Sequence, residues 1–170
     1  MLSKWALEFV AFDSSSSNLI VGDTNGASDV FLRETCLAAS TNCLPSTSRV
    51  SVASDGTEGN GGSGSPSVSA DGRFVAFVSG ATNLVTGDTN NLSHIFVRDT
   101  CHGVATGCTP STTRVSVASD GTEADGASSE PSISANGRFV AFISSANLVP
   151  EKRSNSFDVF ISKSGFALIP

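Results

Sequence analysis

Acidic side chains recur at short spacings along this 170-residue chain, and they are its first candidates for chemistry. Asp23, Asn25 and Asp29 form a D-x-N-x-x-x-D pattern in the segment GDTNGASD. Oxygen ligands spaced in this way along a turn can converge on Ca²⁺, which takes about six to eight of them. Short Asp and Asn side chains also close Asx-turns onto their own backbone. We favour Asx-turns here and keep a calcium site at these three residues as the second interpretation.

The same pattern returns further along the chain with altered chemistry. Asp88 and Asn90 repeat the first two positions, but His94 stands at the third, where an imidazole is a poor calcium ligand. In the last copy only Asp158 remains. The calcium interpretation is therefore confined to the first copy.

A second acidic motif, SDGTE, pairs Asp55 with Glu58 and, in its next copy, Asp120 with Glu123. Paired carboxylates can act as acid and base on a glycosidic bond. Because both pairs recur inside the same loop motif, turn formation and solvation explain them more simply. We therefore predict no catalytic role for them.

Four cysteines, Cys36, Cys43, Cys101 and Cys108, permit three disulfide pairings. The first two and the last two have the same spacing and stand at equivalent places of a repeat, which favours the pairs Cys36–Cys43 and Cys101–Cys108. Zinc binding fits poorly because no histidine pair stands nearby, and the C-x-x-C spacing of redox enzymes is absent. Disulfides are typical of oxidising compartments, so we expect a secreted, periplasmic or cell-surface protein.

Composition disfavours several other sites and partners. The two histidines, His94 and His102, are not near a G-x-S-x-G nucleophile motif, so no Ser-His-Asp triad is predicted. The glycine-rich run GNGGSGS lacks the lysine of a phosphate-binding loop. A net charge of −6 argues against nucleic acid and anionic lipid as partners. No apolar run approaches the roughly 20 residues that span a membrane.

Arginines recur at the ends of predicted strands, at Arg33 and Arg98 and again at Arg49 and Arg114. A guanidinium pairs readily with a carboxylate through charge-assisted hydrogen bonds. We expect all four to be structural ion-pair partners of Asp and Glu rather than ligand contacts.

These candidates belong to an internal repeat with a period of 65 residues. The tetrapeptide FVAF occurs at Phe9–Phe12, Phe74–Phe77 and Phe139–Phe142. The decapeptide RVSVASDGTE occurs at Arg49–Glu58 and again at Arg114–Glu123. Because many separate motifs keep one period, the repeat is the strongest structural signal in the sequence.

One copy of the repeat predicts four short strands, with the alternating apolar residues typical of sheets. They are expected at Pro66–Ala70, Arg73–Ser79, Ser93–Asp99 and Arg114–Ser119. Between the first two, Asp71-Gly72 predicts a tight hairpin with a type I′ turn, which needs positive φ at both central positions. A four-stranded sheet of this size cannot cover its own faces, so it must stack on its copies. The sequence therefore predicts an all-β protein built from β-propeller blades.

The motifs of the repeat follow one another in a fixed order. PSxSADGRFVAFxS is followed by NLV, GDTN, [DH][VI]F[VL]R and RVSVAS, over about Phe9 to Ile161. This order resembles the repeats of TolB-like (WD-repeat-like) β-propellers of bacterial envelope and secreted proteins. The resemblance implies blade architecture but no particular activity, because such propellers serve as binding scaffolds and as domains attached to enzymes.

The chain divides into about three four-stranded blades, at residues 1–58, 66–123 and 131–170, in one partial propeller domain spanning 1–170. The innermost strand of the first blade is expected to be missing or altered, because Lys4–Glu8 replaces the SADGR motif, and Phe166–Ile169 is expected to supply the last strand of the third. Closed propellers have about four to eight blades. We therefore expect a homodimer that completes a six-bladed ring; a fragment of a longer chain or an open arc is the alternative.

The function expected from these features is that of a non-enzymatic, secreted or periplasmic binding module. Its ligand would be a protein or a carbohydrate, met by the GDTN loops and the DGTE connectors. Two alternatives remain open at this stage: a propeller associated with a hydrolase, and a structural surface protein that assembles with itself. No cofactor is expected other than calcium in the second interpretation above.

Overall fold

The computed structural model describes residues 8–37, 43–150 and 156–164, and every regular element in these ranges is a β-strand. The predicted all-β class is thus confirmed. The strands are β1 (Phe9–Ser14), β2 (Asp29–Glu34), β3 (Ser46–Arg49), β4 (Ser63–Val68), β5 (Phe74–Ser79), β6 (His94–Asp99), β7 (Ser111–Arg114), β8 (Ser128–Ile133), β9 (Phe139–Ser144) and β10 (Asp158–Lys163).

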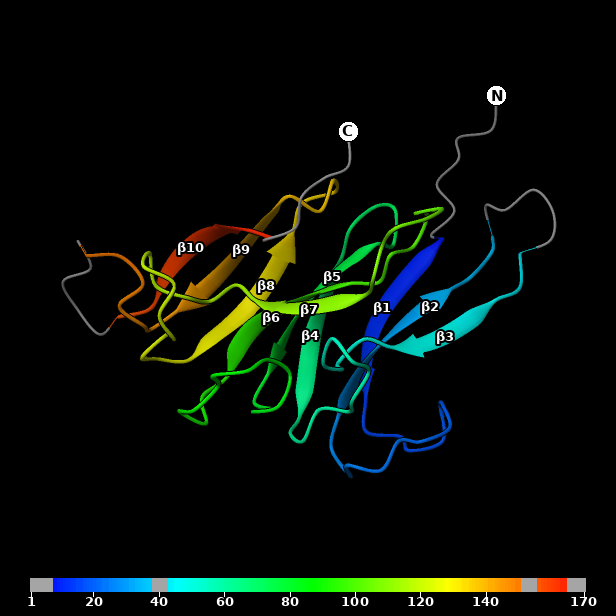
Figure 1. Cartoon of the computed structure of the whole chain (residues 1–170), viewed down its shortest axis with the longest axis horizontal. Coiled ribbons are helices and arrows are strands. Elements are labelled where there is room, and N and C mark those ends of the chain that lie inside the picture. Colours follow the sequence, from blue (N-terminus) through cyan, green and yellow to red (C-terminus); the bar gives the residue numbers. More distant parts are fainter. Residues whose placement is uncertain (1–7, 38–42, 151–155, 165–170) are drawn as a thin grey trace.

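The strands form three antiparallel sheets, one for each copy of the repeat. Sheet 1 has the order β1-β2-β3, sheet 2 the order β4-β5-β6-β7, and sheet 3 the order β8-β9-β10. Sheet 2, drawn in green, lies between the other two in Figure 1. The sheets form an open row rather than a closed ring, so the propeller itself stays a prediction.

The outer sheets have three strands each within residues 8–37, 43–150 and 156–164, against four in sheet 2. In those ranges no strand pairs with the outer edge of β1, the place that β4 takes beside β5. Residues 4–7 of the altered segment and the strand predicted at Phe166–Ile169 lie outside the described residues.

Sheet 2 is covered on both faces, as its strand β5 shows. Phe74 and Ala76 pack in the core shared with sheet 3, whereas Val75 and Phe77 pack in the core shared with sheet 1. Successive side chains of a strand point to opposite faces, so an uninterrupted apolar run suits a strand buried on both sides. The core between sheets 1 and 2 consists of Phe9, Val30, Leu32, Val50, Val75, Phe77, Ala81, Leu84 and Phe96. The core between sheets 2 and 3 consists of Phe74, Ala76, Ile95, Val97, Val115, Ala124, Ile133, Val140, Phe142, Ala146 and Leu148.

The face of each sheet that points toward the next copy in the chain is called here its forward face, and the opposite one its rear face. On the forward face of sheet 2, Ile95 and Val97 are completely buried against sheet 3. Their counterparts on sheet 3, Val159 and Ile161, are 72% and 74% exposed. The forward face of sheet 3 is therefore an apolar surface without cover in the described part of the chain.

Two of the four predicted strands are displaced: the first lies at Ser63–Val68 instead of Pro66–Ala70, and the fourth at Ser111–Arg114 instead of Arg114–Ser119. β4 begins at Ser63 instead of Pro66, because a bulge at Ser65, with a φ of 51°, lets the ladder continue on its other side. The fourth strand, β7, ends at Arg114, where it was expected to begin. It ends there because the hydroxyl of buried Ser116 accepts the backbone N–H of Ile95 at 2.9 Å, which a strand carbonyl would otherwise accept.

The Asp71-Gly72 hairpin is present, but its predicted type I′ turn is wrong. Of the two residues only Gly72 has a positive φ, at 73°, and its N–H donates to the carbonyl of Ser69 at 3.0 Å. This is a type I turn followed by a left-handed glycine. Asp71 Oδ1 accepts hydrogen bonds from Ser69 Oγ at 2.6 Å and from the N–H of Arg73 at 3.1 Å. The aspartate therefore closes the turn through its side chain and needs no left-handed backbone.

The glycine of each hairpin lies on a phenylalanine of the preceding copy. A Cβ atom added to Gly72 would lie 2.5 Å from the ring of Phe9. One added to Gly137 would lie 2.9 Å from Cε2 of Phe74 and closer still to its Cδ2. The contact between successive sheets thus requires glycine for its lack of a side chain as well as for its positive φ.

Candidate functional site

The first acidic pattern folds around an arginine. Nη1 of Arg49, at the end of β3, lies 3.1 Å from Oδ2 of Asp29 and 3.5 Å from Oδ1 of Asp23, and it also pairs with Oε1 of Glu58. Both aspartate side chains are buried, with exposures of 0% and 2%. We call these four residues the Arg49 cluster. Its guanidinium supplies the positive charge that three adjacent carboxylates need.

Asn25 closes an Asx-turn beside this cluster. Its Oδ1 accepts the backbone N–H of Ala27 at 2.7 Å, and its Nδ2 donates to Asp29 Oδ2 at 3.0 Å. Asp29 Oδ1 also accepts the hydroxyl of buried Ser51 at 2.6 Å. A calcium ion bound by Asp23, Asn25 and Asp29 would have to displace Arg49 from among the carboxylates. The calcium site stays a prediction, and the arrangement present is the turn and ion-pair network.

The SDGTE motifs contain two kinds of carboxylate, and neither has the raised pKa of a proton donor. Partial burial disfavours the charge of Glu58, but hydrogen bonds from Oγ1 and N of Thr24, together with Arg49, outweigh it and lower its pKa to about 2. The pKa of exposed Asp55 is also lowered, because the backbone N–H of Thr57 donates to its Oδ1 at 2.9 Å. Both groups are carboxylates at neutral pH, which supports their structural interpretation.

In the second copy an imidazole replaces the most buried carboxylate. Arg114 Nη1 lies 2.7 Å from Oε1 of Glu123 and 3.5 Å from Oδ2 of Asp88. His94, at the position of Asp29, is completely buried, and its Nε2 lies 3.0 Å from Oδ1 of Asn90 and 3.8 Å from Oε1 of Glu123. We call Arg114, Asp88, His94 and Glu123 the Arg114 cluster. It has one negative charge fewer than the Arg49 cluster.

Burial shifts the pKa values of His94 and Asp88 in the Arg114 cluster, whereas hydrogen bonds and Arg114 decide that of Glu123. Burial lowers the pKa of His94, and the nearby guanidinium of Arg114 lowers it further, so that the ring is neutral at neutral pH. Burial raises the pKa of Asp88, whose side chain is 1% exposed. The pKa of Glu123 is set in the same way as that of Glu58. Burial disfavours its charge, but Thr89 and Arg114 outweigh burial and lower the pKa to about 2.

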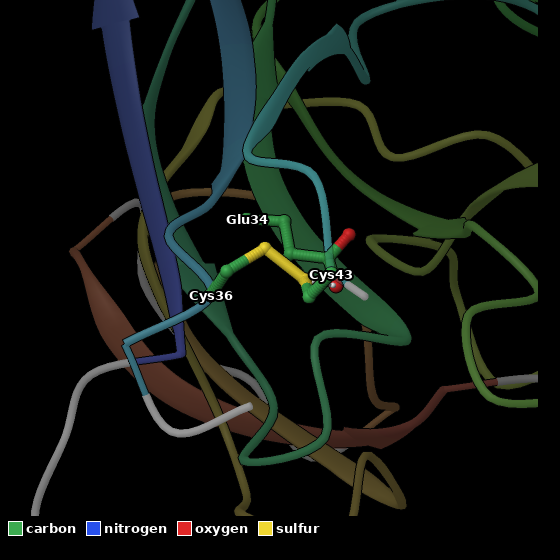
Figure 2. Close-up of side chains that lie close together, drawn as sticks. All are labelled: Glu34, Cys36 and Cys43. Carbon is green, nitrogen blue, oxygen red and sulfur yellow. Dashed lines mark hydrogen bonds between the residues drawn. A yellow bond between two sulfur atoms is a disulfide. The ribbon is translucent and has the colours of Figure 1, made fainter. Parts of the chain in front are cut away.

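The two predicted disulfides are confirmed. Cys36 bonds to Cys43 and Cys101 to Cys108, each with a Cα–Cα distance of 5.7 Å. Figure 2 shows the first of them beside the carboxylate of Glu34. Because both sulfurs of each pair are consumed, the thiolates that zinc would need are not present, and the zinc alternative at the cysteines is wrong. The disulfides indicate an oxidising, extracytoplasmic environment.

Two of the four recurring arginines behave differently from the prediction. Arg49 and Arg114 pair with acids, as expected. Arg33 and Arg98 instead donate from Nη1 to threonine hydroxyls at 3.0 and 3.1 Å, and Arg98 also donates to the carbonyl of Ala53 at 3.0 Å. The ion-pair prediction for Arg33 and Arg98 is wrong, because the facing strand presents a threonine, not an acid, opposite each guanidinium.

A groove of about 350 Å³ recurs at both seams between sheets. Each groove is bordered by the SDGT turn of one copy and by the NLV segment of the next. At the first seam the lining includes Ala53, Ser54, Asp55, Leu84, Val85 and Thr86. At the second it includes Ala118, Ser119, Asp120, Leu148, Val149 and Pro150. The predicted DGTE connectors therefore border concave surface, whereas the GDTN loops are tied to the arginine clusters.

The sequence interpretation missed the threonines of the GDTN motif. Thr24 binds both oxygens of Glu58, and Thr89 binds both oxygens of Glu123, through the backbone N–H and the hydroxyl in each case. The signal was present, since the motif keeps its threonine in both copies together with the glutamate 34 residues later. Only the fold shows that these two positions meet.

Among the described residues there is no helix that is long and apolar enough to cross a membrane. Comparison with protein-family models finds no match for this chain, and comparison with curated proteins finds none either.

Proposed function

We propose that the chain is part of a TolB-like β-propeller that binds a protein or carbohydrate partner without catalysis, as a secreted, periplasmic or cell-surface module. The observation that carries this proposal is the pair of matched grooves at successive seams. Each combines a carboxylate and hydroxyls from one copy with apolar side chains from the next. Such a surface offers hydrogen bonds and a contact area in one place, and its repetition suits a ligand that is itself repetitive.

Removing the groove carboxylates tests this proposal. The double variant Asp55→Asn/Asp120→Asn keeps side chains able to close the turn but removes both charges. Asp71→Asn is the matched control, because Asp71 closes a hairpin turn in the same way outside either groove. On arrays of glycans and of peptides, we expect the wild type and the control to bind the same ligands, and the double variant to lose at least about tenfold in affinity.

Two outcomes would contradict the proposal. If neither array yields a ligand, or if the double variant binds as well as the wild type, the grooves are not the binding surface. If a bound glycan or peptide is cleaved, and cleavage disappears on substitution of one acidic residue, the chain belongs to the hydrolase-associated alternative.

We further propose that the chain associates with a second copy of itself to complete a six-bladed ring. Within the chain, the forward face of one sheet packs on the rear face of the next at both seams. The forward face of sheet 3 carries exposed Phe139, Val159 and Ile161, and Val10 on sheet 1 is 37% exposed. Apolar surface of this kind favours association, and a second copy supplies a sheet built from the same repeat.

Sedimentation equilibrium at micromolar concentration tests the ring. We expect a species of twice the 17.3 kDa chain mass. Ile161→Asp is expected to give a monomer, whereas Val21→Asp, at a fully exposed valine outside that face, is expected to leave the mass unchanged. A wild-type monomer refutes ring closure. Concentration-dependent growth beyond a dimer would favour the self-assembling surface protein instead.

A further inference from the structure

The Arg114 cluster differs from its counterpart in the first copy by an imidazole: Asp88, His94 and Glu123 stand where the first copy brings together three carboxylates, Asp23, Asp29 and Glu58. Asp88, His94 and Glu123 each offer one ligand atom, and these atoms lie within 4.8 Å of one another. Two ligands that are each about 2.1 Å from a zinc ion lie about 3 to 4 Å apart. The 3.8 Å between His94 Nε2 and Glu123 Oε1 is within that range. One imidazole with two carboxylates is a donor set typical of Zn²⁺ and related ions.

The buried carboxylate of Asp88 lacks a hydrogen-bond partner. Its side chain is 1% exposed, yet neither Oδ1 nor Oδ2 accepts a hydrogen bond. The nearest cation in contact is Nη1 of Arg114, 3.5 Å from Oδ2, and that nitrogen is already bonded to Glu123 at 2.7 Å. A buried carboxylate without a hydrogen bond is costly, and a bound cation is one of the few ways to compensate for it.

We propose that Asp88, His94 and Glu123 bind a divalent transition-metal ion of the zinc type in the second copy of the repeat. Nε2 of His94 lies 3.0 Å from Asn90 Oδ1. An imidazole binds a cation through a nitrogen that carries no proton, so the metal-binding tautomer of His94 has its proton on Nδ1, which lies 3.4 Å from Ser116 Oγ. The lone pair of Nε2 then points toward the ion.

The remaining residues of the cluster keep partners when the ion binds. Oδ1 of Asn90 still accepts the backbone N–H of Leu92 at 3.0 Å and lies close enough to Nε2 to serve as a further ligand. Arg114 gives up Glu123 Oε1 but retains its Nη2 contact to the carbonyl of Gly87 at 3.2 Å. Thr89 continues to hold Oε2 of Glu123 at 2.7 Å, which orients that carboxylate as an outer-shell partner would.

The first copy explains why the site is confined to the second. There, Asp29 replaces the imidazole, and its two oxygens accept hydrogen bonds from Ser51, Asn25 and Arg49. With no nitrogen ligand, and with the carboxylate at the position of His94 fully hydrogen-bonded, the Arg49 cluster offers a zinc-type ion much less. The Arg49 cluster is therefore a comparison site for the proposed metal site within the same chain.

Titration of the EDTA-treated, oxidised protein with ZnCl₂ by isothermal calorimetry tests the proposal. We expect one ion per chain. Asp88→Asn and His94→Asp are expected to weaken binding by more than about 100-fold, since even the loss of an outer-shell partner costs about 10- to 100-fold. His94→Asp puts the residue of the first copy into the second. His102→Gln, at the only other histidine, is the matched control and is expected to bind like the wild type.

Failure to bind zinc, or equal binding by wild type and His94→Asp, overturns the proposal, as does equal weakening in His102→Gln. A second measurement needs no variant. On addition of Zn²⁺ to wild-type protein labelled with ¹⁵N in its histidines, the Nε2 resonance of His94 should shift and that of His102 should not. Circular dichroism and thiol titration establish that each variant retains its fold and its disulfides.

Discussion

Replacing Gly137 by alanine tests how the sheets are joined. Gly137 has a φ of 70°, and an added Cβ would lie 2.9 Å from Cε2 of Phe74 and closer to its Cδ2. Phe74 is 1% exposed and belongs to the core between sheets 2 and 3, so its ring has little room to move. The substitution therefore combines a strained backbone with an overpacked contact.

The two costs can be separated by a second glycine. Holding a non-glycine residue in the left-handed region costs about 1–2 kcal/mol, and forcing an extra methyl group into a packed core costs about 1–3 kcal/mol more. Gly121 has a φ of 86° but nothing within 4 Å of an added Cβ. Gly121→Ala should therefore show the backbone cost alone, and Gly137→Ala the sum, about 2–5 kcal/mol.

Urea denaturation of the two variants and the wild type, followed by circular dichroism, measures this difference. The expected result is a lower free energy of unfolding for both variants, with Gly137→Ala lower than Gly121→Ala by about 1–3 kcal/mol. Equal losses in the two variants would show that the glycine–phenylalanine contact does not join the sheets as described.

Three further predictions concern the carboxylates and the disulfides. Folding lowers the pKa of Glu58 and Glu123 to about 2 from an ordinary value of 4.5. Their contribution to stability is therefore complete above about pH 5 and is lost as the pH falls toward 2. The double variant Thr24→Ala/Thr89→Ala should reduce this pH dependence of the unfolding free energy in urea titrations. Saturating CaCl₂ should leave the Tm unchanged, because Arg49 already lies among the carboxylates that calcium would have to bind; an increase that Asp23→Ala abolishes would restore the calcium interpretation. The double variant Cys101→Ser/Cys108→Ser should lose about 2–3 kcal/mol of unfolding free energy, the cost of opening a short loop, and an unchanged midpoint in urea would contradict this.

The features that follow from local pattern were predictable from the sequence. The FVAF run predicted β5 and β9 because a short, continuous apolar run depends only on neighbouring residues. The cysteine pairs were predictable because each closes a loop within one copy. In the same way, Asp71-Gly72 predicted a hairpin, although not its turn type, since the side chain of Asp71 competes with the backbone.

Features that depend on distant positions were not predictable. The end of β7 is set by the Ser116 hydroxyl opposite Ile95, 21 residues earlier in the chain. The start of β4 could not be predicted from the sequence, because serine and glycine at positions 63 and 64 are typical of a loop and a bulge separates them from the predicted strand. His94 looked like the loss of a calcium ligand; only the fold brings it to Glu123 and next to an unbonded Asp88.

The contact between each hairpin glycine and the preceding phenylalanine has a consequence for engineering. Phe9 packs on Gly72 across the first seam and Phe74 packs on Gly137 across the second, so both seams use the same glycine–phenylalanine contact. A segment cut with the 65-residue period, such as residues 66–130, contains both Gly72 and Phe74 and so carries one half of each junction. Inserting a second copy of that segment should therefore lengthen the row by one sheet without redesign of either neighbour, in the manner of a modular array.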